Sequence, residues 1–475
     1  MENLRSFLVI VTIISFYRLF ILLHAGIDLY VDEAYYWGWS KELDFGYYSK
    51  PPMIAWVIAL FGKICGDSQL CIKLPSLVLY PITSIFVYLI AKELFDKRVA
   101  FYSGIVFITL PAVSMSSLII STDVVLLLFW SMSLYFFIKA INSDKNIYWA
   151  LAAISAGAGL LSKYTMILFL ISIFCYLILD ERYRRHLKNP KLYLSIITAA
   201  SIYFPNLLWN AMHHYITFVH TKNLSGIEKS SFLHFNKMVE FLASQFLVFG
   251  PIFFGVFLYL LKDITKPKYR LLFCFSLPFL AIITLQALLS KALANWAAPT
   301  YIAATILVTA YLIQRKKLLF AGIIINILMA LALYHYHDIA KAMHIELTSK
   351  TDPYKRVLGY KELAKKLQPI IAKYPDTKLL FDDRTIMAEM IYYLKPHPFD
   401  AQIFNPEHRI ASQYHLKKDL NNHLHENFLY ITKKDGKKAL PYFASIKKIA
   451  TITIRLYKDY ARIYNVYLVE DFKGY

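Results

Sequence analysis

Residues 29–52 of the chain read LYVDEAYYWGWSKELDFGYYSKPP. The stretch follows one hydrophobic segment, places Asp32 and Glu33 among tyrosines and tryptophans, and ends on Lys50 and two prolines. A loop that only connects two helices needs neither acidic nor aromatic residues at this density. The stretch is therefore a candidate functional loop, and its chemistry depends on the chain around it.

The composition is typical of a protein with many membrane-spanning helices. Of the 475 residues, 57% are hydrophobic, whereas soluble domains are about half apolar. Crossing a hydrocarbon core of about 30 Å takes about 20 apolar residues. No small-residue cleavage site follows the first apolar segment, so we expect it to be retained as a helix. We predict eleven transmembrane helices, near residues 7–27, 70–91, 99–119, 124–140, 147–161, 164–179, 191–210, 237–261, 270–289, 296–313 and 318–335.

Lysine and arginine gather in every second gap between these segments. The sixth gap, for example, contains ERYRRHLKNPK. Because positive residues collect in cytoplasmic loops, the alternation predicts a cytoplasmic N-terminus and, after an odd number of helices, a periplasmic C-terminus in a bacterial inner membrane. This topology also accounts for the net charge of +20, and we expect no nucleic-acid partner.

The composition changes near residue 337, where charges become frequent and apolar runs shorten. Four runs rich in β-branched and aromatic residues predict strands: TKLLFDD, NFLYITKK, IATITIRLY and ARIYNVYLVEDF. YKELAKKLQPIIAKY and TIMAEMIYYL have helical spacing. We predict a transmembrane domain over residues 1–336 and a small periplasmic α/β domain over residues 337–475.

The acidic pair of the first loop has two interpretations. Asp32 and Glu33 precede AYYWGWSKEL, which has helical spacing, so the segment could be a helix that lies on the membrane with aromatic anchors. Alternatively, a carboxylate at the outer face could act as a general base or stabilise a cationic transition state. Asp123, in IISTDVV, is likewise either a helix N-cap or a site residue at the outer rim.

Several cations lie on the same predicted face. Lys50 precedes two prolines that stiffen the chain, where a fixed cation suits a phosphate, although a single lysine can also snorkel. Lys163 in GLLSKYT and Lys291 in LLSKALANW each follow an apolar segment. Arg18 lies inside the first helix, where it needs a partner such as an acid or a ligand phosphate.

The sequence gives little support for nucleotide binding, metal binding or a disulfide. The sequence contains no Gly-rich phosphate loop, no dinucleotide fingerprint and no HExxH. The adjacent pair His213-His214 is poorly spaced for one metal, so a zinc site is weakly supported. Cys65 and Cys71 could form a disulfide across the turn CGDSQLC, but we favour two unpaired thiols.

The order of these motifs resembles a known family. D-E-x-x-Y is followed by Lys50-Pro51, Lys73-Leu74-Pro75, Asp123 at a helix start, and GLLSKYT. This order resembles the polyprenyl-phosphate-sugar glycosyltransferases of GT-C fold, in the bacterial branch similar to protein O-mannosyltransferases and to the lipid A aminoarabinose transferase. SKALANWAAPTY, DDRTIMAEMIYYL and RIASQYHL resemble later parts of that branch.

The resemblance implies a function, and it matches Asp32 to the first-loop catalytic acid of the family, Lys50 to the lysine that holds the donor phosphate, and Asp123 to a second acid near the sugar. The expected function is inverting transfer of a sugar from a polyprenyl (undecaprenyl) phosphate to lipid A, lipopolysaccharide or another cell-envelope acceptor. The alternatives are a protein O-mannosyltransferase and, in another class, a lipid or sugar transporter. Ser49 stands where some relatives have an acid that could join a metal, so the sequence does not support a metal. The expected site residues are Asp32, Asp123 and Glu33 for catalysis, Lys50, Lys163, Lys291 and Arg18 for the donor phosphate, and Tyr36, Tyr47, Tyr48, Trp296 and Tyr301 for the substrate.

Overall fold

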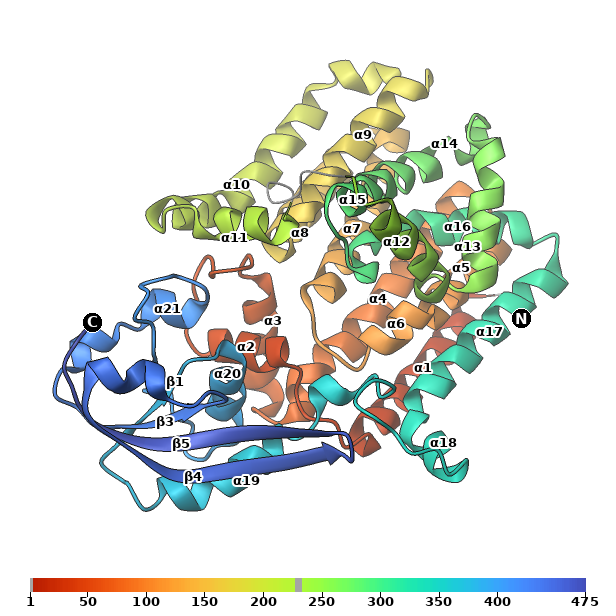
Figure 1. The fold of residues 1–475 in the computed structure, drawn as a ribbon. Coiled ribbons are helices and arrows are strands. Elements are labelled where there is room, and N and C mark those ends of the chain that lie inside the picture. The colour runs from red at the N-terminus through yellow and green to blue at the C-terminus, as the bar shows by residue number, and fades with distance from the viewer. Residues whose placement is uncertain (1–2, 227–232) are drawn as a thin grey trace. The chain divides into compact units, whose positions relative to one another are not determined.

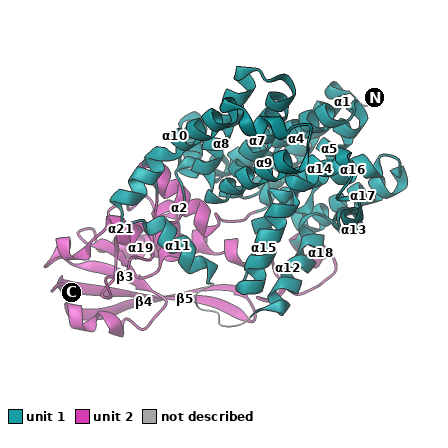
Figure 2. Cartoon of the chain, turned by 90° about the horizontal axis from the view of Figure 1, so that it is seen from above, with its two compact units in different colours: residues 1–25, 44–46, 50–336 teal, residues 26–43, 47–49, 337–475 magenta. Residues whose placement is uncertain are grey.

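The computed structural model describes residues 3–226 and 233–475. Its contacts divide the chain into two compact units (Figure 2). We call residues 1–25, 44–46 and 50–336 the helical unit, and residues 26–43, 47–49 and 337–475 the sheet unit. Most of the quoted first loop thus belongs to the sheet unit, although it lies more than 300 residues before the strands of that unit.

The helical unit is built almost entirely from α-helices (Figure 1). Each predicted apolar segment overlaps one or two of them. Their bounds are α1 Leu4–His24, α3 Met53–Cys65, α4 Gln69–Leu94, α5 Lys97–Thr109, α6 Pro111–Ser116, α7 Thr122–Ser143, α8 Asn146–Ser162, α9 Leu168–Leu179, α10 Pro190–Met212, α11 Ile216–Ser225, α12 Phe235–Val248, α13 Pro251–Tyr259, α14 Pro267–Cys274, α15 Leu277–Leu289, α16 Thr300–Leu312 and α17 Lys316–Tyr334.

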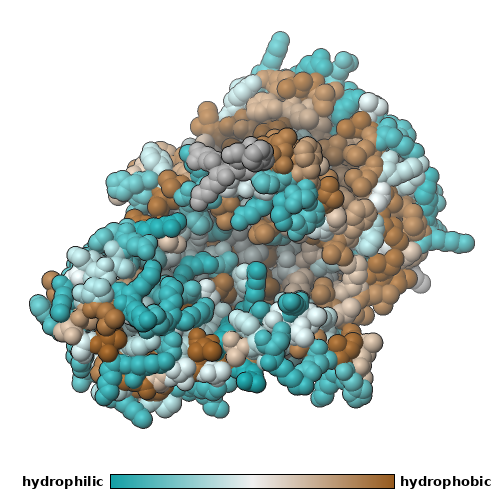
Figure 3. Space-filling view, viewed as in Figure 1, coloured by the Kyte–Doolittle hydropathy of each residue, from teal (hydrophilic) through white to brown (hydrophobic). Residues whose placement is uncertain are grey.

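The lengths of these helices fit a membrane protein. Within the described residues, five helices are long and apolar enough to cross a membrane, or up to seven if each of two bent helix pairs is one span. The sharper bend, 118°, joins α12 to α13. It falls at Gly250, whose φ of +92° favours glycine. Brown, hydrophobic surface covers much of the helical unit in Figure 3, as expected for lipid-facing helices.

A short turn with a disulfide joins α3 to α4. Gly66, with φ +81°, ends α3, and the Ser68 side chain caps α4. This turn brings the Cα atoms of Cys65 and Cys71 to 5.8 Å, and the two residues form a disulfide. Our expectation of two unpaired thiols is therefore wrong, because the tight turn that sets the Cα separation could not be seen in the cysteine spacing.

The sheet unit contains a five-stranded sheet in the order β2-β1-β3-β5-β4. Strand β1 is parallel to β2 and β3, whereas β5 is antiparallel to β3 and β4. The four predicted strands and both predicted helices are confirmed. The bounds are β1 Lys378–Phe381, β2 Gln402–Ile403, β3 Phe428–Thr432, β4 Phe443–Tyr457, β5 Tyr460–Phe472, α2 Val31–Ser40, α18 Tyr336–Ala342, α19 Tyr360–Ile371, α20 Arg384–Tyr393 and α21 Gln413–Lys417.

Helix α2, which carries the acidic pair, is part of the core of the sheet unit. Trp37 is 1% exposed, and its ring lies 4.9 Å from that of Tyr392 in α20 and 4.8 Å from that of His397. The ring of Tyr35 lies 5.2 Å from that of Tyr414 in α21. The aromatic residues of α2 are therefore core residues of this unit, and the interpretation of them as membrane anchors is wrong.

Candidate active site

Asp32 occupies the first turn of α2 and pairs with an arginine from the C-terminal part of the chain. Its Oδ1 lies 3.2 Å from a terminal guanidinium nitrogen of Arg384, the first residue of α20. About a third of each side chain remains exposed. The guanidinium also lies over the Tyr35 ring, 4.9 Å from its centroid. The predicted acid is thus held in place, yet it remains accessible to a substrate.

The two acids nearest to Asp32 have structural contacts. Glu33 is fully buried, and its Oε2 accepts the N–H of Tyr30 at 2.8 Å, which closes the first turn of α2. Asp28 accepts the N–H groups of Tyr360 and Lys361, at the start of α19. Burial raises the pKa of Asp28, and these two N–H donors oppose that shift. Both acids therefore hold the loop in place, and of the three acids around the start of α2 it is Asp32 that solvent can reach.

Three of the four tyrosines predicted to bind substrate are buried in the same unit. Tyr36 is 4% exposed, Tyr47 1% and Tyr48 8%. Tyr47 stacks on Trp39 with 4.5 Å between ring centroids, and its hydroxyl donates to the carbonyl of Trp39. The N–H of Tyr48 donates to the Gln413 side chain. In this structure Tyr47 and Tyr48 hold the shape of the loop.

Lys50 belongs to the helical unit and is half-buried. It is separated by two prolines from Met53, the first residue of α3. Phe45 and Gly46, a few residues earlier, are fixed to α10. The Phe45 carbonyl accepts an N–H of Asn206 at 2.6 Å, and a Cβ at Gly46 would lie 2.4 Å from the Trp209 ring. The chain before the predicted phosphate-binding lysine is thus fixed to α10, and α3 begins shortly after this lysine.

Asp123 and Lys163, predicted separately, form one ion pair in the helical unit. Asp123 lies in the first turn of α7, where the helix dipole favours a carboxylate. Its Oδ1 lies 2.5 Å from the Lys163 ammonium, just beyond the end of α8. Its Oδ2 accepts an N–H of Asn295 at 2.8 Å. The pair is largely buried, and Lys163 already has an anionic partner.

The loop after α15 carries two of the predicted residues, and a third lies at the start of α16. Lys291 is exposed, and Trp296 is half-buried in a short 3₁₀ helix at Ala294–Ala297. Tyr301, in α16, is 3% exposed and stacks on Phe249 with 4.4 Å between centroids. Its hydroxyl donates to Oε1 of Gln245 at 2.6 Å. Lys291 and Trp296 are thus accessible, and Tyr301 anchors the loop.

Arg18 has partners other than an acid or a phosphate. It is 3% exposed within α1. One terminal nitrogen donates to the Ile108 carbonyl near the end of α5, at 2.5 Å, and to the Ser114 hydroxyl at 2.9 Å. A cation at a helix C-terminus is electrostatically favourable. These contacts satisfy the need for a partner that the sequence indicated.

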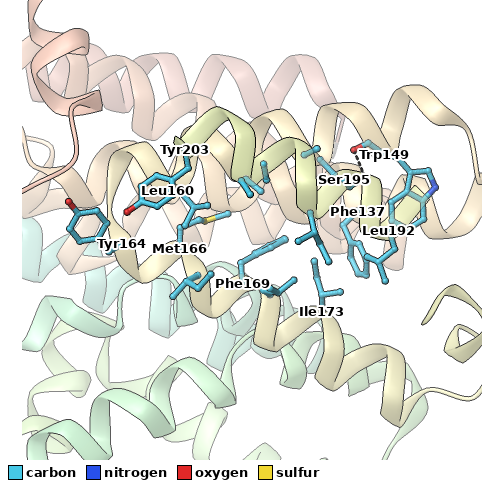
Figure 4. Close-up of a pocket in the computed structure, with 18 of the residues that line it drawn as sticks. Phe137, Trp149, Leu160, Tyr164, Met166, Phe169, Ile173, Leu192, Ser195 and Tyr203 are labelled. Carbon is cyan, nitrogen blue, oxygen red and sulfur yellow. Dashed lines mark hydrogen bonds between the residues drawn. The ribbon is translucent and has the colours of Figure 1, made fainter. Parts of the chain in front are cut away.

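An apolar cavity of about 450 Å³ lies among α7, α8, α9 and α10 (Figure 4). Tyr164 and Trp149 lie toward opposite ends of the row of lining residues that Figure 4 shows. Tyr164 directly follows Lys163 in the chain, so one end of the cavity lies beside the Asp123–Lys163 pair. The volume and the hydrocarbon lining suit a lipid chain.

Metal binding has no geometric support in the described parts of the chain, which hold no group of three or more histidine, cysteine, aspartate or glutamate side chains arranged for a metal. His213 instead stacks on Trp209 with 4.0 Å between centroids. Sequence reasoning missed two partners, Arg384 and Asn295. Both lie in stretches that resemble the family, DDRTIMAEM and SKALANW, but their residue types alone do not indicate a role.

Comparison with known proteins identifies one relative over most of the chain and further matches over parts of it. Residues 49–209 match the family described as dolichyl-phosphate-mannose-protein mannosyltransferase. The lipid A galacturonosyltransferase RgtD of Rhizobium johnstonii is 30% identical over 402 residues, which cover 82% of this chain and 83% of that protein. The lipopolysaccharide core galacturonosyltransferase RgtA of the same organism is 26% identical over 184 residues, covering 38% of this chain and 37% of that protein.

Solved structures show the same fold. The crystal structure of ArnT from Cupriavidus metallidurans in the apo state covers 98% of both chains, with a TM-score of 0.65 and 13% identity. The structure of ArnT bound to undecaprenyl phosphate covers 97% of both chains, with a TM-score of 0.64 and 14% identity. Because RgtD shares 30% identity over most of both chains, and because the fold agrees, the chain belongs to the GT-C glycosyltransferases, as the order of its motifs predicted.

Proposed function

We propose that the protein transfers a sugar from a polyprenyl phosphate to a glycolipid or another cell-envelope glycan at the periplasmic face of the inner membrane. The observation that carries this proposal is the similarity to RgtD over more than four-fifths of the chain. Because RgtD is a lipid A galacturonosyltransferase, lipid A is the first acceptor, and galacturonic acid the first sugar, to be tested. The ArnT structure with undecaprenyl phosphate supports the class of donor.

In the proposed reaction, an acceptor oxygen attacks the anomeric carbon while the bond from that carbon to the donor phosphate breaks. The configuration inverts, and polyprenyl phosphate leaves as a monoester. We assign Lys50 to the donor phosphate, because the ammonium stabilises the charge that grows on the leaving oxygen. Its position before the N-terminus of α3 supports this role, since helix N-termini favour anions.

Asp32 is assigned to the reacting centre. If the acceptor is a hydroxyl, its proton passes to Asp32 as the new bond forms. The Arg384 ion pair uses Oδ1, so Oδ2 is the oxygen that accepts the proton in this proposal. If the acceptor is a phosphate, which is already a nucleophile, Asp32 instead stabilises positive charge at an oxocarbenium-like transition state. We assign Asp123 and Lys163 to the outer end of the apolar cavity, which would take the polyprenyl chain.

The disulfide supports the proposed side of the membrane. The topology that the basic loops predict puts the turn with Cys65 and Cys71 on the periplasmic face. Disulfides persist in the oxidising periplasm and are rare in the cytosol. The same topology puts the sheet unit and all the proposed site residues on the periplasmic side. Nucleotide sugars are absent from the periplasm.

Purified protein with labelled donors tests the proposal. We expect transfer from a polyprenyl-phosphate sugar to lipid A and none from a nucleotide sugar, because the sequence contains no nucleotide-binding motif. Mass spectrometry of lipid A and surface glycans from a deletion strain then names the natural product. Transfer from a nucleotide sugar alone would contradict the proposed donor.

The family match over residues 49–209 favours protein O-mannosyl transfer as a second candidate. In the same deletion strain, unchanged lipid A and glycans together with loss of protein-linked hexose would identify that alternative. A transporter, the alternative in another class, would move labelled lipid across vesicles without forming a new glycosidic bond.

A further inference from the structure

Both carboxylate oxygens of Asp123 contact polar side chains. Oδ1 faces the Lys163 ammonium at 2.5 Å, and Oδ2 accepts an N–H of Asn295 at 2.8 Å. The three residues come from different parts of the helical unit: the start of α7, the end of α8 and the loop after α15. Asp123 therefore links the start of α7 to the end of α8 and to the loop after α15.

The loop that carries Asn295 is itself fixed. The fully buried side chain of Gln245 donates to the Ala294 carbonyl at 3.3 Å and accepts the Tyr301 hydroxyl. The Gln286 amide donates to the Lys291 carbonyl at 3.3 Å. The amide of buried Gln245 and that of partly buried Gln286 thus hold both ends of this loop against α12 and α15. The Asn295 amide is thus presented to Asp123 from a rigid support.

Resting on the proposed function, we propose that Asn295 is a positioning residue for sugar transfer. Its N–H fixes the plane of the Asp123 carboxylate and thereby aims Oδ1 at Lys163. Lys163 directly precedes Tyr164, which lines the apolar cavity assigned to the polyprenyl chain, so its ammonium is a second candidate partner of the donor phosphate beside Lys50. Asn295 acts through Asp123 and does not touch the reacting atoms.

The charged and titratable groups around Asp123 determine how this role is tested. Lys163 pairs with it, and Tyr80 of α4 lies within electrostatic range. Lys73, also of α4, donates to the Leu118 carbonyl in the connection before α7. A carboxylate at position 295 would face that of Asp123, and the pair would take up a proton at mildly acidic pH because two adjacent like charges are unfavourable.

The test compares Asn295→Asp and Asn295→Ala with the wild type by single-turnover transfer from a polyprenyl-phosphate sugar. Asn295→Ala loses a hydrogen bond to a charged group, so the rate should fall roughly 10- to 100-fold, equally at every pH. In Asn295→Asp, two adjacent carboxyls share a proton at low pH, and the protonated one can donate as the amide does. Its rate relative to the wild type should rise about tenfold from pH 8 to pH 5.

Asn223→Asp is the matched control, because it adds the same carboxylate to an exposed position of α11. It should keep the wild-type pH profile. If the wild type is active and the transfer rate of Asn295→Asp relative to it stays constant across pH, the positioning role of Asn295 is overturned. The proposed function would then still stand. A wild type that transfers no sugar from this donor would overturn the proposed function and the positioning role with it.

Discussion

At the scale of single residues, the proposed site depends on contacts between distant parts of the chain. Asp32 pairs with Arg384, which follows it by 352 positions. Asp123 and Asn295 are 172 positions apart. The sequence indicated the acids, because a carboxylate beside the membrane surface is unusual. It did not indicate their partners, because an arginine or asparagine in a polar loop is ordinary until the fold brings it to an acid.

Lys50 is predicted to act on the donor in both the ground state and the transition state. Lys50→Ala should raise the donor KM and also lower the transfer rate, by a combined factor of roughly 10 to 100, the usual effect of losing a charge-assisted hydrogen bond. Steady-state kinetics with a polyprenyl-phosphate sugar measures both. Lys63→Ala is a matched control, since Lys63 is exposed near the other end of α3. Equal losses in the two variants would contradict the phosphate role.

A second prediction at this scale concerns the stability of the sheet unit at mildly acidic pH. Burial lowers the pKa of His415, whose Nδ1 lies 2.8 Å from the Ser412 hydroxyl. The unfolded chain therefore takes up this proton more readily than the folded chain. The free energy of unfolding should fall as the pH decreases below the ordinary histidine pKa of about 6.5. Thermal unfolding from pH 7.5 to 5 should show a smaller decrease in Tm for His415→Gln than for the wild type.

At the scale of elements, local sequence patterns predicted much of the secondary structure. Buried Tyr360, Leu363, Ala364 and Leu367 follow the helical spacing that identified α19. The β-branched run of β4 was equally clear. The packing of α2 could not be predicted in this way, because a helix rich in tyrosine and tryptophan suits a membrane surface as well as a protein core. Its place among the aromatic residues of α20 and α21 depends on chain far away in sequence.

The disulfide between α3 and α4 gives a prediction at this scale. Replacing Cys65 and Cys71 together by serine should lower the stability of the unit by about 2 kcal/mol, because the closed loop is short. Thermal unfolding with and without a reductant measures this difference. Thiol labelling of the unfolded wild type should find only Cys175 and Cys274 reactive until a reductant is added. Labelling of all four cysteines without reductant would contradict the disulfide.

At the scale of the whole molecule, the fold is that of a GT-C glycosyltransferase, with helices of membrane-spanning length and a separate sheet unit. The order of short motifs predicted this family, although each motif alone is weak. Apolar periodicity gave helical segments but not the breaks inside them, because the bend at Gly250 depends on backbone conformation. The number of spans and the sidedness stay predictions.

Reporter fusions test the sidedness that the basic loops predict. An enzyme active only in the periplasm should be active when fused after Tyr475 and silent when fused after Arg185. Arg185 lies in one of the basic gaps, which are predicted to be cytoplasmic, whereas the C-terminus is predicted to be periplasmic. The reverse pattern would put every proposed site residue on the cytoplasmic side and would overturn the proposed donor.

The most direct test of the central claim is single-turnover sugar transfer by Asp32→Asn. Asparagine keeps the shape of the side chain but removes its charge, so donor affinity should stay near the wild-type value. The rate should fall by about 10²- to 10⁴-fold, the usual effect of losing a positioned base. Glu42→Gln, an exposed acid of the same loop, should keep the wild-type rate. If Asp32→Asn inserts into the membrane and transfers sugar as fast as the wild type, the first loop is not the catalytic loop of this enzyme.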